Sequence, residues 1–592
     1  MLAHRPERPT SPAPWHGRVA GVAPLVVGLS VFAAAGVVMR TYAGSGGGQR
    51  AAPAAAAARV PARPPPSPLV LGYNLDFPGD WSDAIPFIDL MHDARPWQGG
   101  GKKDPVVDLD LDTHGWPRSL NGYDAITSIV RTGSGAGFVG HDWRASYRGE
   151  GTLTVDGTVD VVEQKPGSIR FRGKPGNVWI TIRATDPART GNYIRDITIV
   201  REDRRRLHAA GKTFNPDLLA FLAPFRSLRF MDWMLSNDKE PAHGGRWTAR
   251  STLDQAQWRT QFIDPHHPGA GLTAGGYPVE VLVRLANELG ASPHFNMPYQ
   301  ADDAYVRSFA TLVRAQLAPT LGVTVEYSNE VWNWGFPQAT YAREQAEKLW
   351  PGEGSGWIQF MGARASTMCG IWKDVFASPA DKRRVRCVIA PQTGWFDIAT
   401  ASLECPRWVA MGHAPCHVGM DAIAITGYFS GLIHRTENAA LVKAWLQQGK
   451  AFALDQAFRQ LELGDVSGLR DGDQPASPGR SDSLRSVAEV FRSFRKLADR
   501  YGLDLYVYEG GTHFDNDRDP IVRDFLIDVV HEPRMEAVYL KLLQSFADAG
   551  GPVFNLWGGI GAGSTWANAD SLTDRAHPKY RAAARFAARR PP

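Results

Sequence analysis

Short apolar runs alternate with longer amphipathic stretches over most of the chain. The apolar runs have the length of buried β-strands, whereas the amphipathic stretches carry apolar residues at helical spacing. One such stretch, 278–289, has Pro278 at its first turn and Gly290 just past its end, as a capped helix does. The strand-like runs are 69–75, 227–233, 292–298, 323–327, 386–391, 420–428, 503–508 and 551–557. Strands that alternate with helices in this way predict an α/β fold, a (β/α)8 TIM barrel.

Between the first two of these strands the pattern changes to period-2 alternation with glycine-containing turns. The alternating runs include 151–156, 168–172, 178–182 and 194–199. Short strands at this spacing predict an antiparallel β-sandwich. We therefore expect a β-sandwich domain at 106–205, inserted into a barrel that begins at 69–105 and resumes at 206–575. A ligand-binding role and a packing or lid role are both open for this domain.

The N-terminal region has a different pattern. Residues 1–18 contain three arginines, and the uncharged run 19–39 that follows is long enough to cross a bilayer. We predict a cytoplasmic N-terminus at 1–18 and a transmembrane signal-anchor at 19–39, with a cleaved signal peptide as the alternative. Residues 40–68, rich in Ala, Gly and Pro, predict a linker, and 576–592 a basic C-terminal tail. The folded part is expected outside the cytoplasm, either membrane-anchored by a single pass or secreted.

The charge balance argues against nucleic acid as a partner. Charged residues make up 21% of the chain and the net charge is +4, with much of the excess in the arginine-rich ends. Binding to phosphates requires a concentrated basic patch, and the sequence shows none. The length of 592 residues indicates two or three domains rather than one.

The four cysteines all fall within one short region. In an exported protein this clustering predicts two disulfides, and we expect the pairs Cys369–Cys387 and Cys405–Cys416. A zinc site is the alternative, although its spacing fits no standard finger; it would use Cys405, His413, Cys416 and His417. Two aspartate-rich runs, 108–112 and 515–519, imitate calcium loops but lack glycine at the sixth position. We predict no metal and no organic cofactor.

Candidate chemistry lies at the ends of two predicted strands. The strand 323–327 leads into Asn329 and Glu330, and the strand 503–508 leads directly into Glu509. In a parallel barrel the carboxyl ends of the strands meet at one face, where catalytic residues lie. Two carboxylates beside aromatic residues are what hydrolysis of a glycosidic bond requires. Either glutamate alone is more simply a solvated or ion-paired residue, so the prediction depends on the pair.

These residues, with an arginine on the second strand and a tryptophan on the eighth, resemble the retaining glycoside hydrolases of clan A. The resemblance covers roughly 69–575 without the inserted domain. Two segments, VEYSNEVWNW (325–334) and FIDLMHDARPW (87–97), are similar to a group of bacterial proteins labelled cellulose-binding or glycosidase-like. If the resemblance holds, Glu330 is the general acid/base and Glu509 the nucleophile, with carboxyls about 5–5.5 Å apart. The compartment would then be the bacterial inner membrane or the exterior.

The resemblance also implies a set of supporting residues. Arg229 would keep Glu509 ionised, Tyr428 would donate to it, and Asn329 would bind the sugar 2-hydroxyl. Trp332 or Trp334 would supply an apolar wall for Glu330, although only one of these alternate residues is expected to face the site. Each residue also has a plain structural interpretation. The remaining predicted substrate contacts are His294, Asn296 and Trp557.

The predicted function is hydrolysis of a β-linked polysaccharide or oligosaccharide. The alternative is a non-catalytic carbohydrate-binding or polysaccharide-assembly protein that keeps the barrel as a scaffold, because a fold alone does not separate the two. An aldolase-type barrel enzyme is a weaker alternative. It would need a Schiff-base lysine or a metal cluster at the strand ends, and these strands offer neither.

Overall fold

The computed structural model describes residues 68–589, except 76, 78, 101–108, 134, 239–244, 259–275, 477–478, 480 and 516–518. The predicted signal-anchor at 19–39 and almost all of the predicted linker lie outside these residues. Within the described part, every helix is too short or too polar to cross a bilayer. The start of the predicted basic tail forms the last helix, α16 (Pro578–Arg589).

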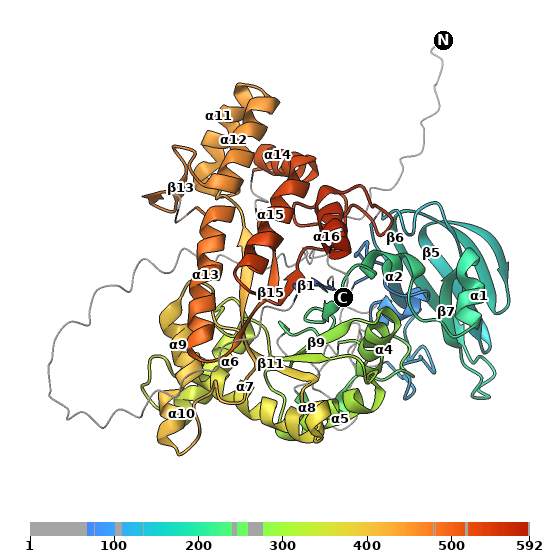
Figure 1. The fold of residues 1–592 in the computed structure, drawn as a ribbon. Coiled ribbons are helices and arrows are strands. Elements are labelled where there is room, and N and C mark those ends of the chain that lie inside the picture. Colours follow the sequence, from blue (N-terminus) through green and yellow to red (C-terminus); the bar gives the residue numbers. More distant parts are fainter. Residues whose placement is uncertain are drawn as a thin grey trace, which may run out of the picture. The chain divides into compact units, whose positions relative to one another are not determined.

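Eight parallel strands close into a barrel, which confirms the predicted (β/α)8 architecture (Figure 1). The closed order is β1-β16-β15-β12-β11-β10-β9-β8, with β1 paired to β8. Most strands are buried on both faces, as a parallel sheet covered by helices requires. The strands are β1 (Val70–Asn74), β8 (Ser227–Arg229), β9 (Ser292–Met297), β10 (Val323–Tyr327), β11 (Val385–Ile389), β12 (Ala422–Phe429), β15 (Asp504–Thr512) and β16 (Val553–Leu556).

Amphipathic helices lie between the strands, and their ends follow the capping signals in the sequence. Helix α4 (Val279–Leu289) starts after Pro278 and ends at Gly290, whose φ of 61° is left-handed. Helix α5 (Asp303–Gln316) begins at Asp302, whose side chain accepts from the Tyr305 amide. Other helices of the barrel part are α2 (Pro216–Leu222), α6 (Pro337–Leu349), α7 (Gly356–Val375), α9 (Phe396–Glu404), α11 (Ala439–Gln447), α12 (Lys450–Leu463), α13 (Leu484–Arg500), α14 (Pro520–His531) and α15 (Arg534–Asp548).

The segment between β1 and β8 contains the expected antiparallel structure, but as one six-stranded sheet rather than two separate sheets. The long strand β6 pairs with β5 along its whole length, with β4 through its first half and with β3 through its second half. One continuous strand therefore joins what the sequence pattern presents as two layers. The strands are β2 (Gln98–Gly99), β3 (Ile126–Arg131), β4 (Asp142–Arg148), β5 (Gly151–Lys165), β6 (Ser168–Thr185) and β7 (Arg195–Arg201).

The antiparallel sheet is tied to the loop that follows β1. The buried guanidinium of Arg131, at the end of β3, donates to the Asp80 carbonyl at 2.9 Å and to the Asp83 carboxyl at 2.8 Å. The Asp89 carboxyl accepts from the Ile199 amide of β7 at 2.7 Å. These buried contacts indicate that the sheet packs on the first βα loop of the barrel.

Both predicted disulfides are present, Cys369–Cys387 and Cys405–Cys416. The first joins α7 to β11, and the second joins the end of α9 to residue 416. The zinc alternative is therefore wrong, because two of its four ligands are oxidised to a disulfide. His413 instead stacks on Trp408, with ring centroids 3.5 Å apart.

Replacing Cys405 and Cys416 together by alanine is expected to lower the free energy of unfolding by about 2–4 kcal/mol, since the crosslink restricts the unfolded chain. Urea unfolding followed by tryptophan fluorescence measures this loss. A reducing agent should destabilise the parent protein further than it does the double variant. Equal stability of parent and variant without reductant would contradict the crosslink.

Candidate active site

The two predicted catalytic glutamates meet at the carboxyl ends of the barrel strands. Glu330 follows the end of β10, Glu509 lies in β15, and their carboxyls are close enough that each shifts the pKa of the other. Both side chains are buried, each residue being 2% exposed. Residues 179 positions apart in the sequence therefore form one coupled acidic pair.

A β-bulge in β15 aims two consecutive side chains at this pair. Val507 pairs with Ile425, but the next registered pair is Glu509 with Thr426, so Tyr508 is skipped. In a regular strand Tyr508 and Glu509 would point to opposite faces. With the bulge, the Tyr508 hydroxyl donates to Glu330 Oε1 at 3.0 Å, while Glu509 contacts the same carboxyl.

Glycine permits the close packing just beyond this bulge. A Cβ on Gly510 would lie 2.7 Å from the Phe554 ring and 2.8 Å from the Gly427 carbonyl oxygen. Either distance is far inside van der Waals contact, so no larger residue fits without displacing β12 or β16. The Glu509-Gly510 sequence therefore reflects a packing need beside the site.

The chain after β10 turns sharply to present Glu330. Ser328 and Glu330 both have left-handed backbone conformations, with φ of 58° and 41°. Such conformations are unfavourable for residues other than glycine, and they persist where the surrounding structure holds them. Here Asn333 closes the turn, because its backbone amide donates to the Glu330 carbonyl at 2.8 Å and its side chain donates to Glu330 Oε2 at 2.9 Å.

The surroundings of Glu330 favour its protonated form. Burial raises the pKa of Glu330 well above its ordinary value, and the neighbouring Glu509 carboxylate raises it further. Hydrogen bonds from Asn333 and Tyr508 act in the opposite direction. Of the two carboxyls, Glu330 is thus the one whose protonated form the surroundings favour.

Glu509 has a different environment, because a cation lies beside it. Burial raises the pKa of Glu509 overall, although Arg229, Glu330 and Tyr428 each act to lower it. Arg229 Nη1 donates to Glu509 Oε2 at 3.1 Å. Glu509 therefore carries the charge of the pair, as an arginine partner favours.

Arg229 is shared between two carboxylates rather than dedicated to Glu509. Its guanidinium is fully buried and binds Glu326 of β10 through three contacts of 2.9–3.1 Å. It also donates to Asn74 Oδ1 at 3.0 Å and lies over the Tyr508 ring, 4.8 Å from the centroid. Burial alone would lower the pKa of Arg229, but the two carboxylates raise it overall.

Asn329, predicted to contact a sugar hydroxyl, is engaged by the protein through both ends of its amide. Its Oδ1 accepts from Arg229 Nη2 at 2.8 Å, and its Nδ2 donates to Asn237 Oδ1 at 3.1 Å. Gln338 of α6 donates to the same Asn237 oxygen at 2.8 Å. Asn329 thus lies at the site with its orientation fixed by charged and amide neighbours.

His294 and Asn296 of β9 lie beneath the pair instead of beside it. His294 Nε2 contacts Glu326 Oε2 at 2.9 Å, and burial lowers the pKa of its ring. Asn296 donates to the Ser328 carbonyl at 2.8 Å, which supports the left-handed turn. Both side chains are buried, so in this structure their contacts are with the protein.

Half-buried aromatic residues surround Glu509 on the open side. Trp557 follows β16, and its ring is 6.4 Å from that of Tyr428 and 4.9 Å from that of Trp566. His513 lies 4.9 Å from Trp566, so the rings form one cluster. Tyr428 and Trp557 were expected here, whereas Trp566 and His513 carry no signal in the sequence pattern.

The two tryptophans after β10 separate, as their alternate positions predict. Trp332 is 5% exposed and Trp334 is 51% exposed. Trp334 packs on Trp357 of α7 with ring centroids 4.8 Å apart, and the Arg343 guanidinium lies 5.6 Å from its ring. Trp334 is therefore a surface residue of the rim.

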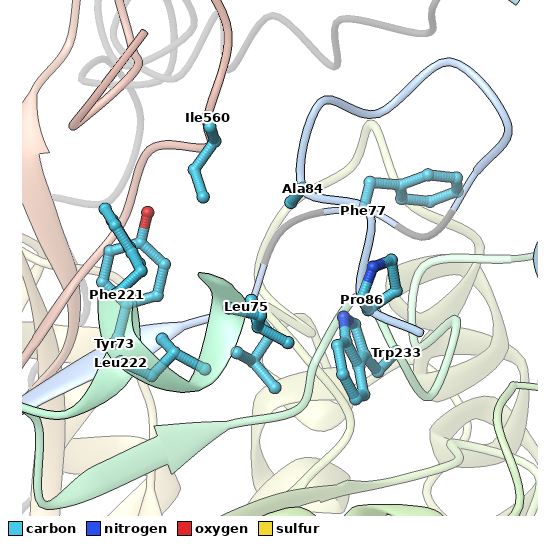
Figure 2. A pocket seen from close by; sticks show the side chains of 10 residues that line it. Tyr73, Leu75, Phe77, Ala84, Pro86, Phe221, Leu222, Trp233 and Ile560 are labelled. Atoms are coloured by element: carbon cyan, nitrogen blue, oxygen red, sulfur yellow. The ribbon is translucent and has the colours of Figure 1, made fainter. Parts of the chain in front are cut away.

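An apolar pocket beside β1 is not the place of this chemistry. Figure 2 shows its lining, which includes Tyr73, Leu75, Phe77, Pro86 and Trp233. None of the described residues that line it has a carboxyl group. The described lining of this pocket therefore offers no carboxyl group for acid–base chemistry.

Three residues of the site were missed from the sequence: Glu326, Asn74 and Tyr508. Glu326 had a usable signal, because it is a charged residue within an otherwise apolar strand, where burial requires a partner. Asn74 had a similar signal, because it is a polar residue at the end of the apolar strand β1. It donates to the Tyr508 carbonyl at 3.0 Å. Tyr508 had no signal, since its direction depends on the bulge.

No protein family matches the sequence, and no curated protein matches it. Similar solved structures include a GH10 protein from Paenibacillus barcinonensis, 12% identical, covering 62% of this chain and 92% of that chain with a TM-score of 0.33. A 4-O-α-L-rhamnosyl-β-D-glucuronidase from Fusarium oxysporum 12S is 11% identical, covers 63% of each chain and has a TM-score of 0.34. A Bacteroides ovatus GH5 xyloglucanase is 12% identical, covering 78% of this chain and 96% of that chain with a TM-score of 0.31. These structural neighbours are glycoside hydrolases, and the activity of this chain is inferred below from its own side chains.

Proposed function

We propose that the protein is a retaining glycoside hydrolase that acts on a β-linked oligosaccharide or polysaccharide. Glu330 is the general acid/base and Glu509 is the nucleophile. The supporting observation is a buried carboxyl pair with unequal surroundings, one member next to amide and phenol donors and the other next to Arg229. Unequal environments give two like groups an acidic and a basic role.

The reaction follows from these two protonation states. In the first step Glu509 attacks the anomeric carbon while Glu330 gives its proton to the leaving oxygen, so that a glycosyl–enzyme ester forms and the glycosidic bond breaks. In the second step Glu330, now ionised, takes a proton from water, and the water oxygen displaces Glu509 from the anomeric carbon. The product keeps its configuration, and both carboxyls return to their starting states.

The mechanism requires about 5–5.5 Å between the two carboxyls, which leaves room for the sugar ring. Since both glutamates are buried, a sugar ring reaches them from the half-buried cluster of Tyr428, Trp557 and Trp566. Aromatic faces of this kind stack on the apolar face of a sugar ring.

The two disulfides favour an oxidising compartment, which supports a site of action outside the cytoplasm. A polymeric sugar outside the cell is a substrate consistent with that location.

The decisive experiment compares the parent protein with Glu509→Gln on soluble glucans, mannans and xylans. Release of reducing sugar by the parent and its loss in the variant, with binding to the same glycan retained, supports the hydrolase. If neither protein releases sugar but both bind a glycan equally well, the barrel is a carbohydrate-binding protein and the proposal fails. Circular dichroism of both proteins controls for folding.

A second test addresses Tyr508. Its hydroxyl donates to Glu330, which lowers the pKa of that carboxyl, so Tyr508→Phe is expected to raise the pKa of Glu330. The acid must be protonated to act, and its deprotonation sets the basic limb of the pH profile. The basic limb of kcat/KM should therefore move to higher pH. A matched control is Tyr305→Phe, a buried tyrosine of α5, which should leave this limb in place.

A further inference from the structure

Two histidines and an aspartate, none of which contacts Glu330 or Glu509, gather where α14 meets the segment after β16. His531 ends α14, while Asp570 and His577 belong to the 557–577 segment between β16 and α16. One potential ligand atom from each of the three lies within 4.8 Å of the other two. The rings of His531 and His577 have centroids 4.8 Å apart, at 64° to each other.

The hydrogen bonds of His531 determine which of its nitrogens faces the group. Nδ1 lies 2.8 Å from the Ile527 carbonyl, which can only accept, so Nδ1 carries a proton. Nε2 of the neutral ring then presents a lone pair to Asp570 Oδ1 at 2.9 Å. Two acceptors at this distance require a cation or a second proton between them. Metal-binding histidines commonly donate their other ring nitrogen to a backbone carbonyl in this manner.

His577 gives independent support for a bound ion, because one of its buried nitrogens lacks a partner in the described part of the chain. It is 3% exposed, and its Nε2 has no hydrogen-bond partner among the described residues. Burial, together with Lys579 and His531, lowers the pKa of His577 to about 3, so the ring is neutral near pH 7. A buried polar nitrogen without a partner costs about 1–3 kcal/mol, which a bound ion would offset.

We propose that His531, Asp570 and His577 bind a divalent transition-metal ion of the Zn²⁺ class. Imidazole nitrogens with one carboxylate suit zinc and its neighbours better than calcium or magnesium, which prefer oxygen ligands alone. Three protein ligands leave one position of a tetrahedral ion for water. Binding through His577 Nε2 places the ring proton on Nδ1, so the 3.3 Å contact with the Lys579 amide is given up.

The ion would fasten the 557–577 segment to α14. Two residues after His577, the buried Lys579 donates to the Thr565 and Trp566 carbonyls at 3.1 and 3.2 Å and to Thr512 Oγ1 at 2.7 Å. Thr512 ends β15, the strand of Glu509. The proposed ion is therefore structural and stabilises the segment that carries Trp566. This inference does not depend on the proposed hydrolase activity.

The test titrates the metal-stripped full-length protein with Zn²⁺ alone by calorimetry, and with Co²⁺ followed by its visible absorption. We expect one equivalent of tight binding and a higher melting temperature with Zn²⁺, because the ion binds the folded state. His531→Gln and Asp570→Asn, both at partly exposed positions, should each weaken binding by more than the roughly 10–100-fold loss that follows removal of an outer-shell partner.

The matched control is His114→Gln. His114 also pairs with an aspartate, Asp254, at 3.2 Å, but the described residues supply no third ligand to that pair. This variant should bind Zn²⁺ as the parent does. Absence of Zn²⁺ binding to the parent, or equal binding by the parent, His531→Gln and Asp570→Asn, would overturn the proposal. Equal protection by Mg²⁺ would overturn the assignment to a transition metal.

Discussion

Replacing Arg229 with methionine is expected to cost about 3–5 kcal/mol of folding stability, since it leaves buried charges without their partner. Arg229 is fully buried and neutralises Glu326 and Glu509, which lie at 2.9 and 3.1 Å. Without the guanidinium, both carboxyls must take up protons or remain ionised in a dry interior. Urea unfolding at neutral pH, followed by tryptophan fluorescence, measures the loss.

A second substitution separates this charge effect from lost packing. The double variant Arg229→Met with Glu326→Gln lacks one of the two unpaired carboxylates. Its loss of folding stability should therefore be smaller than that of Arg229→Met alone. Arg229→Lys should fall between the parent and Arg229→Met, because an ammonium keeps the charge without the forked geometry. A loss of less than about 1 kcal/mol for Arg229→Met, the range of exposed ion pairs, would contradict the buried network.

Replacing Glu330 with alanine is expected to lower kcat/KM on a natural glycan by about 10²–10⁴-fold, the usual contribution of a positioned acid/base. The loss should be smaller for an aryl glycoside with a good leaving group, because that bond breaks with little help from an acid. Added azide should then attack the glycosyl–enzyme ester and give a β-glycosyl azide. Product configuration by proton NMR is the measurement.

Glu509→Gly is the matched partner of that variant, because the two residues have opposite roles. Azide should occupy the space of the lost carboxylate and attack the substrate directly, which gives the α-glycosyl azide. If the two variants give azides of the same configuration, the assigned roles are wrong. Asp482→Asn is the control for loss of a buried carboxyl elsewhere, because Asp482 lies in the loop before α13. This variant should hydrolyse the glycoside without added azide.

The barrel was predictable because its signals are local. Each strand is an apolar run bounded by polar residues, and the helices carry their caps in the sequence, such as Gly290 after α4 and Asp302 before α5. Burial of both faces of a parallel sheet imposes this pattern on every strand alike. The clustering of the cysteines indicated two disulfides but not their connectivity, and the structure pairs cysteines 18 and 11 residues apart.

The antiparallel domain is a case in which the local sequence pattern predicts the strands but not the number of sheets. Alternation along β5 and β6 indicated strands correctly, but whether β6 continues from one layer to the next depends on its partners β4 and β3. Pairing partners are chosen by contacts across the chain, so the number of sheets did not follow from the pattern.

At the site, the sequence by itself determined that an acidic residue would lie near the carboxyl end of each of two barrel strands, because strands and polar residues are read directly from the chain. Only the tertiary structure decided that Arg229 binds Glu326 as well as Glu509, and that the Tyr508 hydroxyl donates to Glu330. The physical reason is that burial makes every charge and donor depend on partners from other strands. A bulge of one residue in β15 then decides which side chains meet.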